Sequence, residues 1–293
     1  MLEELAVVVL EQIGRSTGLR YGPVERTILG ESQTTFMVRA GDERLVLKLE
    51  PASRTQAHRN AARTCEYLSA AGYPAPRTVA MGILSDHAFA LRTCLPGASM
   101  TPEDGGRHVG RLLSLLDLHR DAAEAAGLAP GLWPESVVAP VLSGGAGYCL
   151  LETMRGHSRE SSDLLDALQS LVFANRASLP GARDIMHYDF NPANILVDSG
   201  GVSGVVDWEG VRAGDHAFDL ATMLFYTYDA AEARTALWRR SRELRPASVF
   251  SVYMAHVVLR QVEWSLRMHA PAIGRGYLDR AHRVLSDLEV QLA

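Results

Sequence analysis

Two short segments in the second half of the chain carry side chains whose types and spacing could do chemistry. Residues 187–194 read HYDFNPAN and residues 204–209 read GVVDWE. Asp189 stands in a loop after an apolar strand, Asn194 lies five positions later, and Asp207 closes a second apolar strand thirteen positions further on. Phosphoryl transfer requires a carboxylate that accepts a proton from a hydroxyl, together with hard oxygen ligands for Mg²⁺. These three side chains match that requirement.

The order of these residues is more informative than any one of them. A loop rich in Asp and Asn is by itself an ordinary turn. A His-x-Asp-x4-Asn run, followed by an apolar strand and by an Asp that closes a second apolar strand, is much rarer. Because the second strand can pair back on the first as a hairpin, we expect Asp189, Asn194 and Asp207 to meet at one edge of a small sheet.

Lys48 is the only lysine of the chain, so the other 28 of the 29 Lys and Arg residues are arginine. A coding bias explains the arginines but not the exception. A compact ammonium is a point charge that a planar guanidinium does not replace. The lysine lies on a predicted strand, residues 44–50, on the face opposite Leu45, Leu47 and Leu49.

The elements that must position these residues fall into two groups. The first ninety residues predict a helix followed by a small sheet, with a second helix over residues 55–71; the strands are expected at 24–29, 35–39, 44–50, 78–83 and 88–93. The Pro96-Gly97 pair marks the expected boundary between a lobe of residues 1–95 and a lobe of residues 96–293.

The second lobe is predicted to be mainly helical around a short strand-rich interval. The strands are expected at 184–187, 194–198 and 202–208, and the helices at 102–126, 159–177, 215–228, 230–244, 247–268 and 275–291. The chain is therefore expected to be a two-lobed α+β enzyme, with a small antiparallel sheet lobe, a larger helical lobe and a cleft as the default binding site.

Composition narrows the classes of partner and location. The 293 residues are 47% hydrophobic and carry a net charge of −5, so the chain has no broad basic footprint for nucleic acid. Its three cysteines are far apart and predict reduced thiols. No run approaches the roughly 18 apolar residues that span a bilayer. The amino-terminal run LEELAVVVLEQIG begins with acidic residues and predicts an amphipathic surface helix, and we expect a cytoplasmic protein.

Residues 187–221 resemble the aminoglycoside phosphotransferase and choline kinase-like family, which shares the protein-kinase fold. The family's usual motifs are His-Gly-Asp-x4-Asn and Ile-Asp-Trp-Glu, and GDHAFDLA at residues 214–221 is similar to its Gly-Asp-Pro-x-x-Asp-Leu-Ala. The resemblance implies that Asp189 is the catalytic base and that Asn194 and Asp207 hold magnesium. It also implies that Asp219 braces the catalytic loop, with His187 as a packed organiser of that loop.

The same resemblance implies an ATP site in the first lobe. Lys48 would hold the α- and β-phosphates and pair with a helix glutamate, and Glu66 is the only acid of the following helix. No Gly-x-Gly-x-x-Gly occurs near the amino terminus; LGESQTT at residues 29–35 takes its place, where Ser32 and Thr34 either cradle phosphate or belong to an ordinary hairpin turn. Cys94 marks the hinge whose backbone would bind adenine.

Several residues are candidates for the acceptor side. Tyr188 replaces the family's usual glycine beside the base and would shape the acceptor pocket. Glu209 either approaches the second metal or the acceptor, or points to solvent. On the predicted helix 247–268, Glu263 and Trp264 either contact a cationic or polyhydroxylated acceptor or belong to a solvated face. The mixture of arginine and glutamate on that face does not match a strongly acidic pocket for a polycationic aminoglycoside.

The sequence therefore predicts an ATP- and Mg²⁺-dependent O-phosphotransferase that acts on the alcohol group of a small molecule. Antibiotic modification, and with it antibiotic resistance, is one use of the family, and metabolite kinases are equally compatible. A specialised peptide Ser/Thr kinase is an alternative, although the chain has no recognisable Ala-Pro-Glu activation segment. A non-catalytic pseudokinase-like binding subunit is a second alternative, against which the intact set of site residues counts.

Overall fold

A computed structural model describes residues 2–18, 20–26 and 34–292 of the chain. These residues form two compact units. The sheet unit consists of Met1–Met100, Ala125–Leu128 and Ala193–Val211, and the helical unit consists of Thr101–Glu124, Ala129–Pro192 and Arg212–Ala293. Both units are discontinuous in the sequence, and residues 193–211 belong with the amino-terminal sheet.

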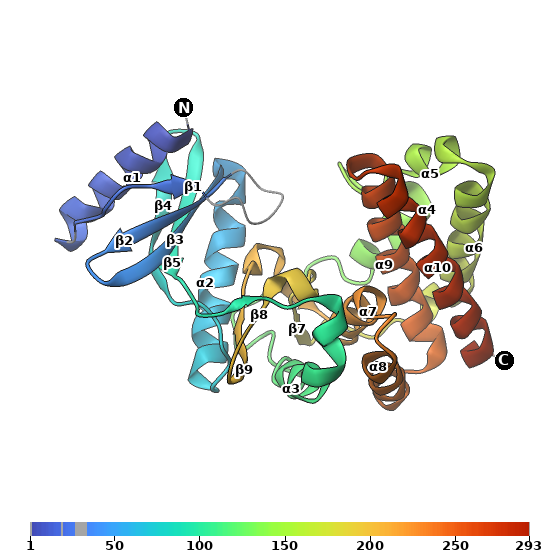
Figure 1. Cartoon of the computed structure of the whole chain (residues 1–293). Helices are drawn as coiled ribbons and strands as arrows, with labels where there is room; N and C mark the ends of the chain where they lie inside the picture. Colours follow the sequence, from blue (N-terminus) through green and yellow to red (C-terminus); the bar gives the residue numbers. More distant parts are fainter. Residues whose placement is uncertain (1, 19, 27–33, 293) are drawn as a thin grey trace. The chain divides into compact units, whose positions relative to one another are not determined.

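The sheet unit is built on a five-stranded antiparallel sheet in the order β1-β2-β3-β5-β4 (Figure 1). Its strands are β1 (Glu25–Arg26), β2 (Thr35–Ala40), β3 (Glu43–Pro51), β4 (Thr78–Leu84) and β5 (His87–Thr93). Strict alternation places Leu45, Leu47 and Leu49 of β3 in the core. Helix α1 (Leu2–Thr17) packs its apolar stripe on this face, as the amphipathic pattern of its sequence predicts.

Helix α2 (Thr55–Ala70) contacts strands β4 and β5 of the same sheet. The buried side chains of α2 recur at helical spacing and are His58, Ala61, Thr64, Cys65 and Leu68. Lys48 of β3 and Arg92 of β5 both lie on the sheet face away from the leucines, because Lys48 is paired with Ala90 and Val46 with Arg92. The polar face of the sheet therefore carries two cations on neighbouring strands.

A second, three-stranded sheet completes the sheet unit in the order β6-β8-β9. Its strands are β6 (Ala98–Ser99), β8 (Ile195–Asp198) and β9 (Gly201–Val205), and β8 and β9 form the expected hairpin. Gly97 has φ 102°, and a Cβ at this position would lie 2.5 Å from the carbonyl oxygen of Val197. Only glycine allows this close approach, which joins the chain after β5 to the β8–β9 hairpin.

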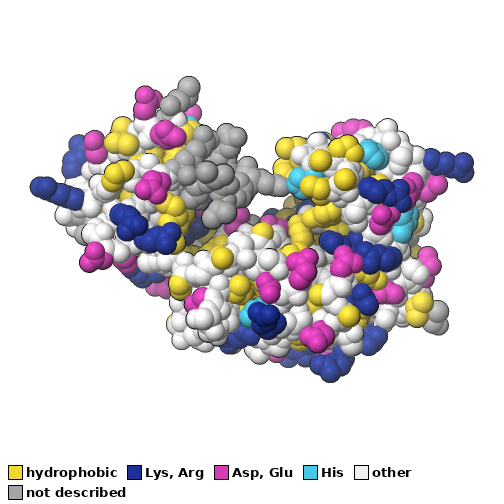
Figure 2. All heavy atoms as spheres, in the orientation of Figure 1, with side chains coloured by type: hydrophobic (Ala, Val, Ile, Leu, Met, Phe, Trp, Pro, Cys, Tyr) yellow, Lys and Arg dark blue, Asp and Glu magenta, His cyan; other side chains and the backbone are white. Residues whose placement is uncertain are grey.

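The helical unit is organised around α9 (Ala247–Met268). Helices α4 (Glu135–Ser143), α6 (Arg159–Asn175), α7 (Ala217–Tyr226) and α10 (Pro271–Leu292) all contact α9, so its side chains are buried on nearly every side. The remaining helices are α3 (Gly105–Asp117), α5 (Leu151–His157) and α8 (Ala231–Leu244), and β7 (Asp184–Met186) pairs with β10 (Arg212–Gly214) in a two-stranded sheet. On the face drawn in Figure 2, positively and negatively charged side chains of this unit are interspersed.

The α+β architecture is the expected one, with a small antiparallel sheet and a larger helical part. Three expectations about elements were wrong. The helix predicted over 102–126 ends at Asp117, and Asp121, further along the predicted range, adopts a positive φ that a helix does not allow. Helices α4 and α5 were not predicted; α4 contains Pro140 and α5 has only seven residues. Strand β7 pairs with β10 rather than with the β8–β9 hairpin, so the strand before Asp189 lies in a different sheet from those beside Asn194 and Asp207.

The first strand and the lengths of the helices complete the description of the fold. Of the strand expected at 24–29, the structure describes β1 at Glu25–Arg26, and residues 27–29 lie outside the described residues. Within the described part of the chain, no helix has both the length and the apolar character needed to cross a membrane.

The alternation in β3 predicts unequal costs of truncation on its two faces. Leu47 is fully buried, so Leu47→Ala should lower the free energy of unfolding by about 2–5 kcal/mol. Val46→Ala, on the half-buried face, should cost about 1 kcal/mol. Urea unfolding followed by circular dichroism measures both, and equal losses for the two variants would contradict the assigned faces.

Candidate active site

Lys48 is held by two carboxylates at the polar face of β3. Its Nζ donates a hydrogen bond to Asp207 Oδ1 at 2.6 Å and lies 3.3 Å from Glu209 Oε2. The lysine side chain is 15% exposed, whereas that of Asp207 is 47% exposed. The chain's only lysine is therefore fixed beside the segment that closes the hairpin β8–β9.

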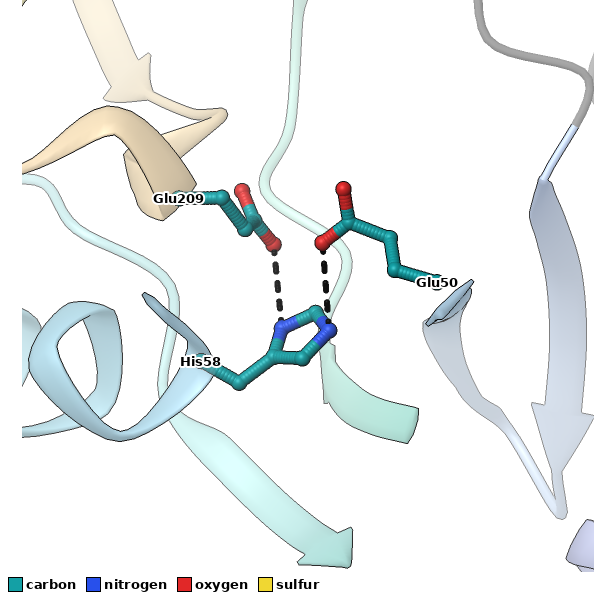
Figure 3. Close-up of side chains that lie close together, drawn as sticks. All are labelled: Glu50, His58 and Glu209. Carbon is teal, nitrogen blue, oxygen red and sulfur yellow. Dashed lines mark ion pairs between the residues drawn. The ribbon is translucent and has the colours of Figure 1, made fainter. Parts of the chain in front are cut away.

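Glu209 is the buried centre of this cluster. Its side chain is 3% exposed, and its Oε1 accepts a 2.5 Å hydrogen bond from Arg92 Nη1. His58 Nδ1 lies 3.5 Å from the same oxygen, and His58 Nε2 lies 3.2 Å from Glu50 Oε2. Figure 3 shows the imidazole of α2 between the two glutamates. One buried carboxylate is thus surrounded by a guanidinium, an ammonium and an imidazole.

Both members of the Lys48–Glu209 pair are ionised. Burial alone would lower the pKa of Lys48, but the charges of Glu209 and Asp207 outweigh burial and hold the pKa above its usual value. Burial alone would likewise raise the pKa of Glu209, yet Arg92, His58 and Lys48 hold this pKa well below its usual value. Opposite charges in one buried cluster therefore keep each other ionised.

The expected pair between Lys48 and Glu66 is wrong. The ion pairs described for Lys48 are with Asp207 and Glu209, and Glu66 is exposed on α2. The reason is the register of the helix, because His58, Ala61 and Cys65 occupy the face that packs inward and turn residue 66 outward. Of the two interpretations of Glu209, the one that points it to solvent was also wrong, since its side chain is 3% exposed. An approach of Glu209 to a metal or to an acceptor stays a prediction.

Asn194 and Asp207 fit the donor set that magnesium prefers. Asn194 directly precedes β8, and its carbonyl oxygen accepts a hydrogen bond from Val206 N at 3.0 Å. This contact sets the start of β8 beside the end of β9, where Asp207 adopts a left-handed conformation (φ 64°, ψ 54°). An amide and a half-exposed carboxylate from adjacent strand ends supply hard oxygens, which are Mg²⁺ ligands.

A buried carboxylate braces the loop that carries Asp189 in the helical unit. Asp219 of α7 is fully buried, and its two oxygens accept hydrogen bonds from the backbone N–H groups of His187 (2.7 Å) and Tyr188 (2.8 Å). His187 is also fully buried, and its Nδ1 accepts a hydrogen bond from Asp189 N at 3.3 Å. These contacts are those that the family resemblance implies for Asp219 and His187.

Arg260 of α9 orients Asp189 itself. Its Nη2 donates to Asp189 Oδ1 at 3.2 Å, and its Nη1 donates to the carbonyl oxygen of Tyr188 at 2.9 Å. Arg260 is 9% exposed. Burial would lower its pKa, but Asp189 and its neighbours raise it, so the guanidinium stays charged beside the carboxylate. One arginine therefore fixes both the loop backbone and the candidate base.

Tyr188 lies next to Asp189 in the braced loop. Its φ of 75° lies in the left-handed region, which explains why glycine is usual at this position. The ring stacks on Phe218 with a 2° angle between planes and a 5.3 Å centroid distance, and the Arg212 guanidinium lies 4.0 Å from the Tyr188 centroid. The hydroxyl lies 3.2 Å from His256 Nε2 and 3.4 Å from the hydroxyl of Tyr148.

The tautomer of His256 follows from its two partners. Its Nδ1 is 2.8 Å from the carbonyl oxygen of Val137, which can only accept, so Nδ1 carries the proton. Nε2 therefore accepts the proton of the Tyr188 hydroxyl. Burial, with the nearby charge of Arg260, lowers the pKa of His256 to about 3. The imidazole is neutral and fixes the tyrosine hydroxyl.

The two acceptor candidates on α9 are arranged differently from the expectation. The polar face of α9 is buried rather than solvated, and Glu263 is fully buried. Glu263 Oε1 accepts from Arg267 Nε at 2.6 Å, and the same guanidinium lies 4.9 Å from the centroid of the Trp264 ring. The glutamate is therefore neutralised within its own helix.

The remaining nucleotide candidates carry less information. Ser32 lies outside the described residues. The carbonyl oxygen of Thr34 accepts from Leu49 N at 2.9 Å, which continues the β2–β3 pairing. Cys94 N donates to the carbonyl oxygen of Arg44 at 2.9 Å. The roles of Ser32, Thr34 and Cys94 in binding nucleotide stay predictions.

Sequence reasoning did not assign roles to Arg92, His58 and Arg260. Arg92 stands in the strand AFALRT, where four apolar residues precede it, and a charge in such a strand is a signal of a buried partner. Arg260 interrupts the long apolar pattern of α9 in the same way. His58 carries no comparable signal, because a single histidine on an amphipathic helix is common.

A family profile described as the phosphotransferase enzyme family matches residues 25–249, which is most of the chain. The chain belongs to the phosphotransferase enzyme family. The resemblance drawn from residues 187–221 is thereby confirmed. The Lys48 cluster and the Asp219-braced loop both lie within the residues that match this family.

Several proteins of known activity or structure are similar to this member of the family. Hygromycin-B 4-O-kinase from Escherichia coli is 32% identical over 109 residues, which are 36% of this chain and 32% of that protein. The matched part is thus about a third of that relative's length. The match therefore leaves most of the relative uncompared.

The similarity to solved structures extends over nearly the whole chain. A thermostable mutant of aminoglycoside phosphotransferase APH(4)-Ia in its apo form gives a TM-score of 0.72 at 17% identity, over 95% of this chain and 98% of that one. Choline kinase LicA from Streptococcus pneumoniae gives 0.67 at 14% identity, over 97% and 99%. These neighbours confirm the kinase-like fold expected from the sequence.

The neutral state of His256 predicts a pH dependence of stability. The unfolded histidine binds a proton below about pH 6.5, whereas the folded one binds it only near pH 3, so the free energy of unfolding falls as the pH falls through this window. Between pH 7 and pH 5 the contribution is about 2 kcal/mol. Urea unfolding of His256→Gln should show a correspondingly smaller loss, while His157→Gln, at an exposed position on α5, should follow the parent protein.

Proposed function

We propose that this member of the phosphotransferase enzyme family transfers the γ-phosphate of ATP, with Mg²⁺, to a hydroxyl of a small molecule. The observation that carries the proposal is the contact of the chain's only lysine with Asp207 at the end of the β8–β9 hairpin. A phosphate-binding ammonium beside a carboxylate with the oxygen chemistry of a magnesium ligand is the arrangement that phosphoryl transfer uses.

The sheet unit supplies the nucleotide-binding groups in this proposal. Lys48 binds the phosphates, and Asn194 and Asp207 hold Mg²⁺. The metal, when bound, neutralises charge that develops on the phosphates. A ternary complex of the APH(4)-Ia mutant with ADP and hygromycin B has a TM-score of 0.71 to this chain, which supports a nucleotide as the donor.

The helical unit supplies the base. Asp189 accepts the proton of the acceptor hydroxyl, and Arg260 orients the carboxylate. Because Asp219 and His187 immobilise the loop backbone, the carboxylate is directed by the fold rather than by the acceptor. Tyr188 forms an aromatic wall against which an acceptor ring packs.

The acceptor is proposed to be an alcohol on a small molecule, and hygromycin B and choline are the first to test. The named activities of the kinase from Escherichia coli and of LicA motivate these two compounds. A strongly polycationic acceptor is less favoured, because Glu263 is already paired with Arg267 and Asp189 with Arg260. ATP consumption measured across aminoglycosides, amino alcohols, sugars and peptides identifies the acceptor, and no consumption with any of them would count against the proposal.

Removal of the base separates binding from chemistry. Asp189→Ala should lower the turnover of ATP with the identified acceptor by about 10²- to 10⁴-fold. The affinity for ATP, measured by calorimetry, should be unchanged. Asp163→Asn, at an exposed position on α6, is the control and should keep full activity. Full activity of Asp189→Ala would exclude it as the base.

The lone lysine predicts that charge alone is insufficient at position 48. Lys48→Arg keeps a cation but replaces a compact ammonium by a planar guanidinium in a site that is 15% exposed. The dissociation constant for ATP should rise by about tenfold or more. Arg15→Lys, on the surface of α1, is the matched control because it makes the reverse exchange of arginine for lysine. This variant should bind ATP with unchanged affinity.

A further inference from the structure

We propose that Glu209, held by Arg92 and His58, is the residue that positions Lys48 for nucleotide phosphates, in place of a helix glutamate. The proposal rests on the function proposed above. It assigns positioning roles to three residues that contact the lysine directly or through Glu209. All of them lie in the sheet unit.

Helix α2 has no carboxylate on the face that packs inward. The buried residues of α2 are a histidine and small or apolar side chains, and its one acid, Glu66, is exposed. The 3₁₀ turn Trp208–Gly210 packs against α2 and brings Glu209 to the lysine instead. The carboxylate therefore approaches Lys48 from the segment after β9.

The 3₁₀ turn is firmly fixed, so the position of Glu209 is defined. Trp208 is fully buried, its indole N–H donates to the carbonyl oxygen of Val205 at 2.8 Å, and its ring meets Tyr73 edge-on at 5.6 Å. Arg54 Nη2 donates to the carbonyl oxygen of Glu209 at 3.2 Å. Hydrogen bonds therefore hold both a side chain and the backbone of the turn.

The two oxygens of Glu209 have different partners. Oε1 accepts from Arg92, and Oε2 faces Lys48 Nζ at 3.3 Å. Lys48 and Arg92 project from the same face of neighbouring strands, so without a carboxylate between them their charges would repel. Glu209 contacts both cations, offsets their repulsion and fixes the Lys48 ammonium relative to β5.

His58 completes the arrangement from the helix. Its two ring nitrogens lie 3.5 Å from Glu209 Oε1 and 3.2 Å from Glu50 Oε2, and Glu50 lies two residues after Lys48 on the same face of β3 (Figure 3). The imidazole thus ties the carboxylate to the strand that carries the lysine. Glu50, His58 and Glu209 could also ligate a metal, but Arg92 and Lys48 already supply two cations to Glu209 and disfavour a third.

Glu209 gives Lys48 a second carboxylate partner besides Asp207. The other partner of Lys48 is the carboxylate assigned above to magnesium. Glu209 is buried and is also held by Arg92 and His58, so we expect it to keep its contact with Lys48 when Asp207 engages a metal. The lysine is in this way attached to the segment 207–209 rather than to α2.

A single lysine makes the position of its side chain directly measurable. Selective labelling with ¹³Cε-lysine gives one resonance, since the chain has only Lys48. Glu209→Gln should shift and sharpen this resonance, because the side chain loses its buried charged partner and gains mobility. Glu66→Gln, the matched control on α2, should leave the resonance unchanged. An unchanged resonance in Glu209→Gln, or a shift in Glu66→Gln, would overturn the proposal.

Binding of ATP in the absence of Mg²⁺ supplies a second readout. The dissociation constant of Glu209→Gln, measured by calorimetry in EDTA, should rise by about 10- to 100-fold. His58→Gln retains a hydrogen-bonding side chain, so its dissociation constant for ATP should rise less than that of His58→Ala. If wild-type protein does not bind ATP, the proposed function fails, while the lysine resonance still tests the positioning role.

A double variant separates positioning from stability. Glu209→Gln leaves Arg92 buried without its partner and should lower the thermal midpoint, whereas Arg92→Met/Glu209→Gln removes both charges and should recover much of the loss. The lysine resonance of the double variant should nevertheless remain shifted, and its ATP affinity should remain low. If the lysine resonance and the ATP affinity of the double variant recovered together with the thermal midpoint, Glu209 would act only through stability.

Discussion

The Glu209 carboxylate is removed from water and surrounded by Lys48, Arg92 and His58, and the polar side of the sheet unit depends on this cluster. Burial of an unpaired carboxylate costs on the order of several kcal/mol, so the cations are a condition for the fold and not an addition to it. In return, one side chain links β3, β5, α2 and the turn after β9. The same contacts compensate the buried charge of Glu209 and fix the position of the Lys48 ammonium.

The helical unit uses a second buried carboxylate in a different way. Asp219 accepts hydrogen bonds from two backbone N–H groups and so fixes a loop conformation, whereas Glu209 fixes side chains. The fixed loop allows Tyr188 to adopt a positive φ, whose cost is offset by the stacking of its ring on Phe218 and by its hydroxyl contacts. Arg260 of α9 then contributes to the orientation of Asp189.

The sequence predicted those parts of the site that local pattern determines. The alternation of β3 placed Lys48 on the correct face, and the motif at residues 187–221 located the braced loop and the hairpin ends. The sequence assigned Glu66 as the partner of Lys48 and did not predict Glu209 in this place, because the partner depends on the rotation of α2 and on a contact to the distant segment after β9. For the charged face of α9 the sequence left open a solvated surface or an acceptor contact, whereas Arg260 and Glu263 are buried because helices pack around α9 on nearly all sides.

The composition of the sheet unit has a consequence for synthesis of the chain on the ribosome. The first hundred residues contain the five strands, Lys48 and Arg92, but the carboxylate that neutralises these two cations is residue 209. The nascent sheet therefore lacks the Glu209 bridge between these two cations while about a hundred further residues are translated. The amino-terminal unit is complete only after residues 193–211 have been synthesised. The two units therefore cannot fold one after the other in sequence order during translation.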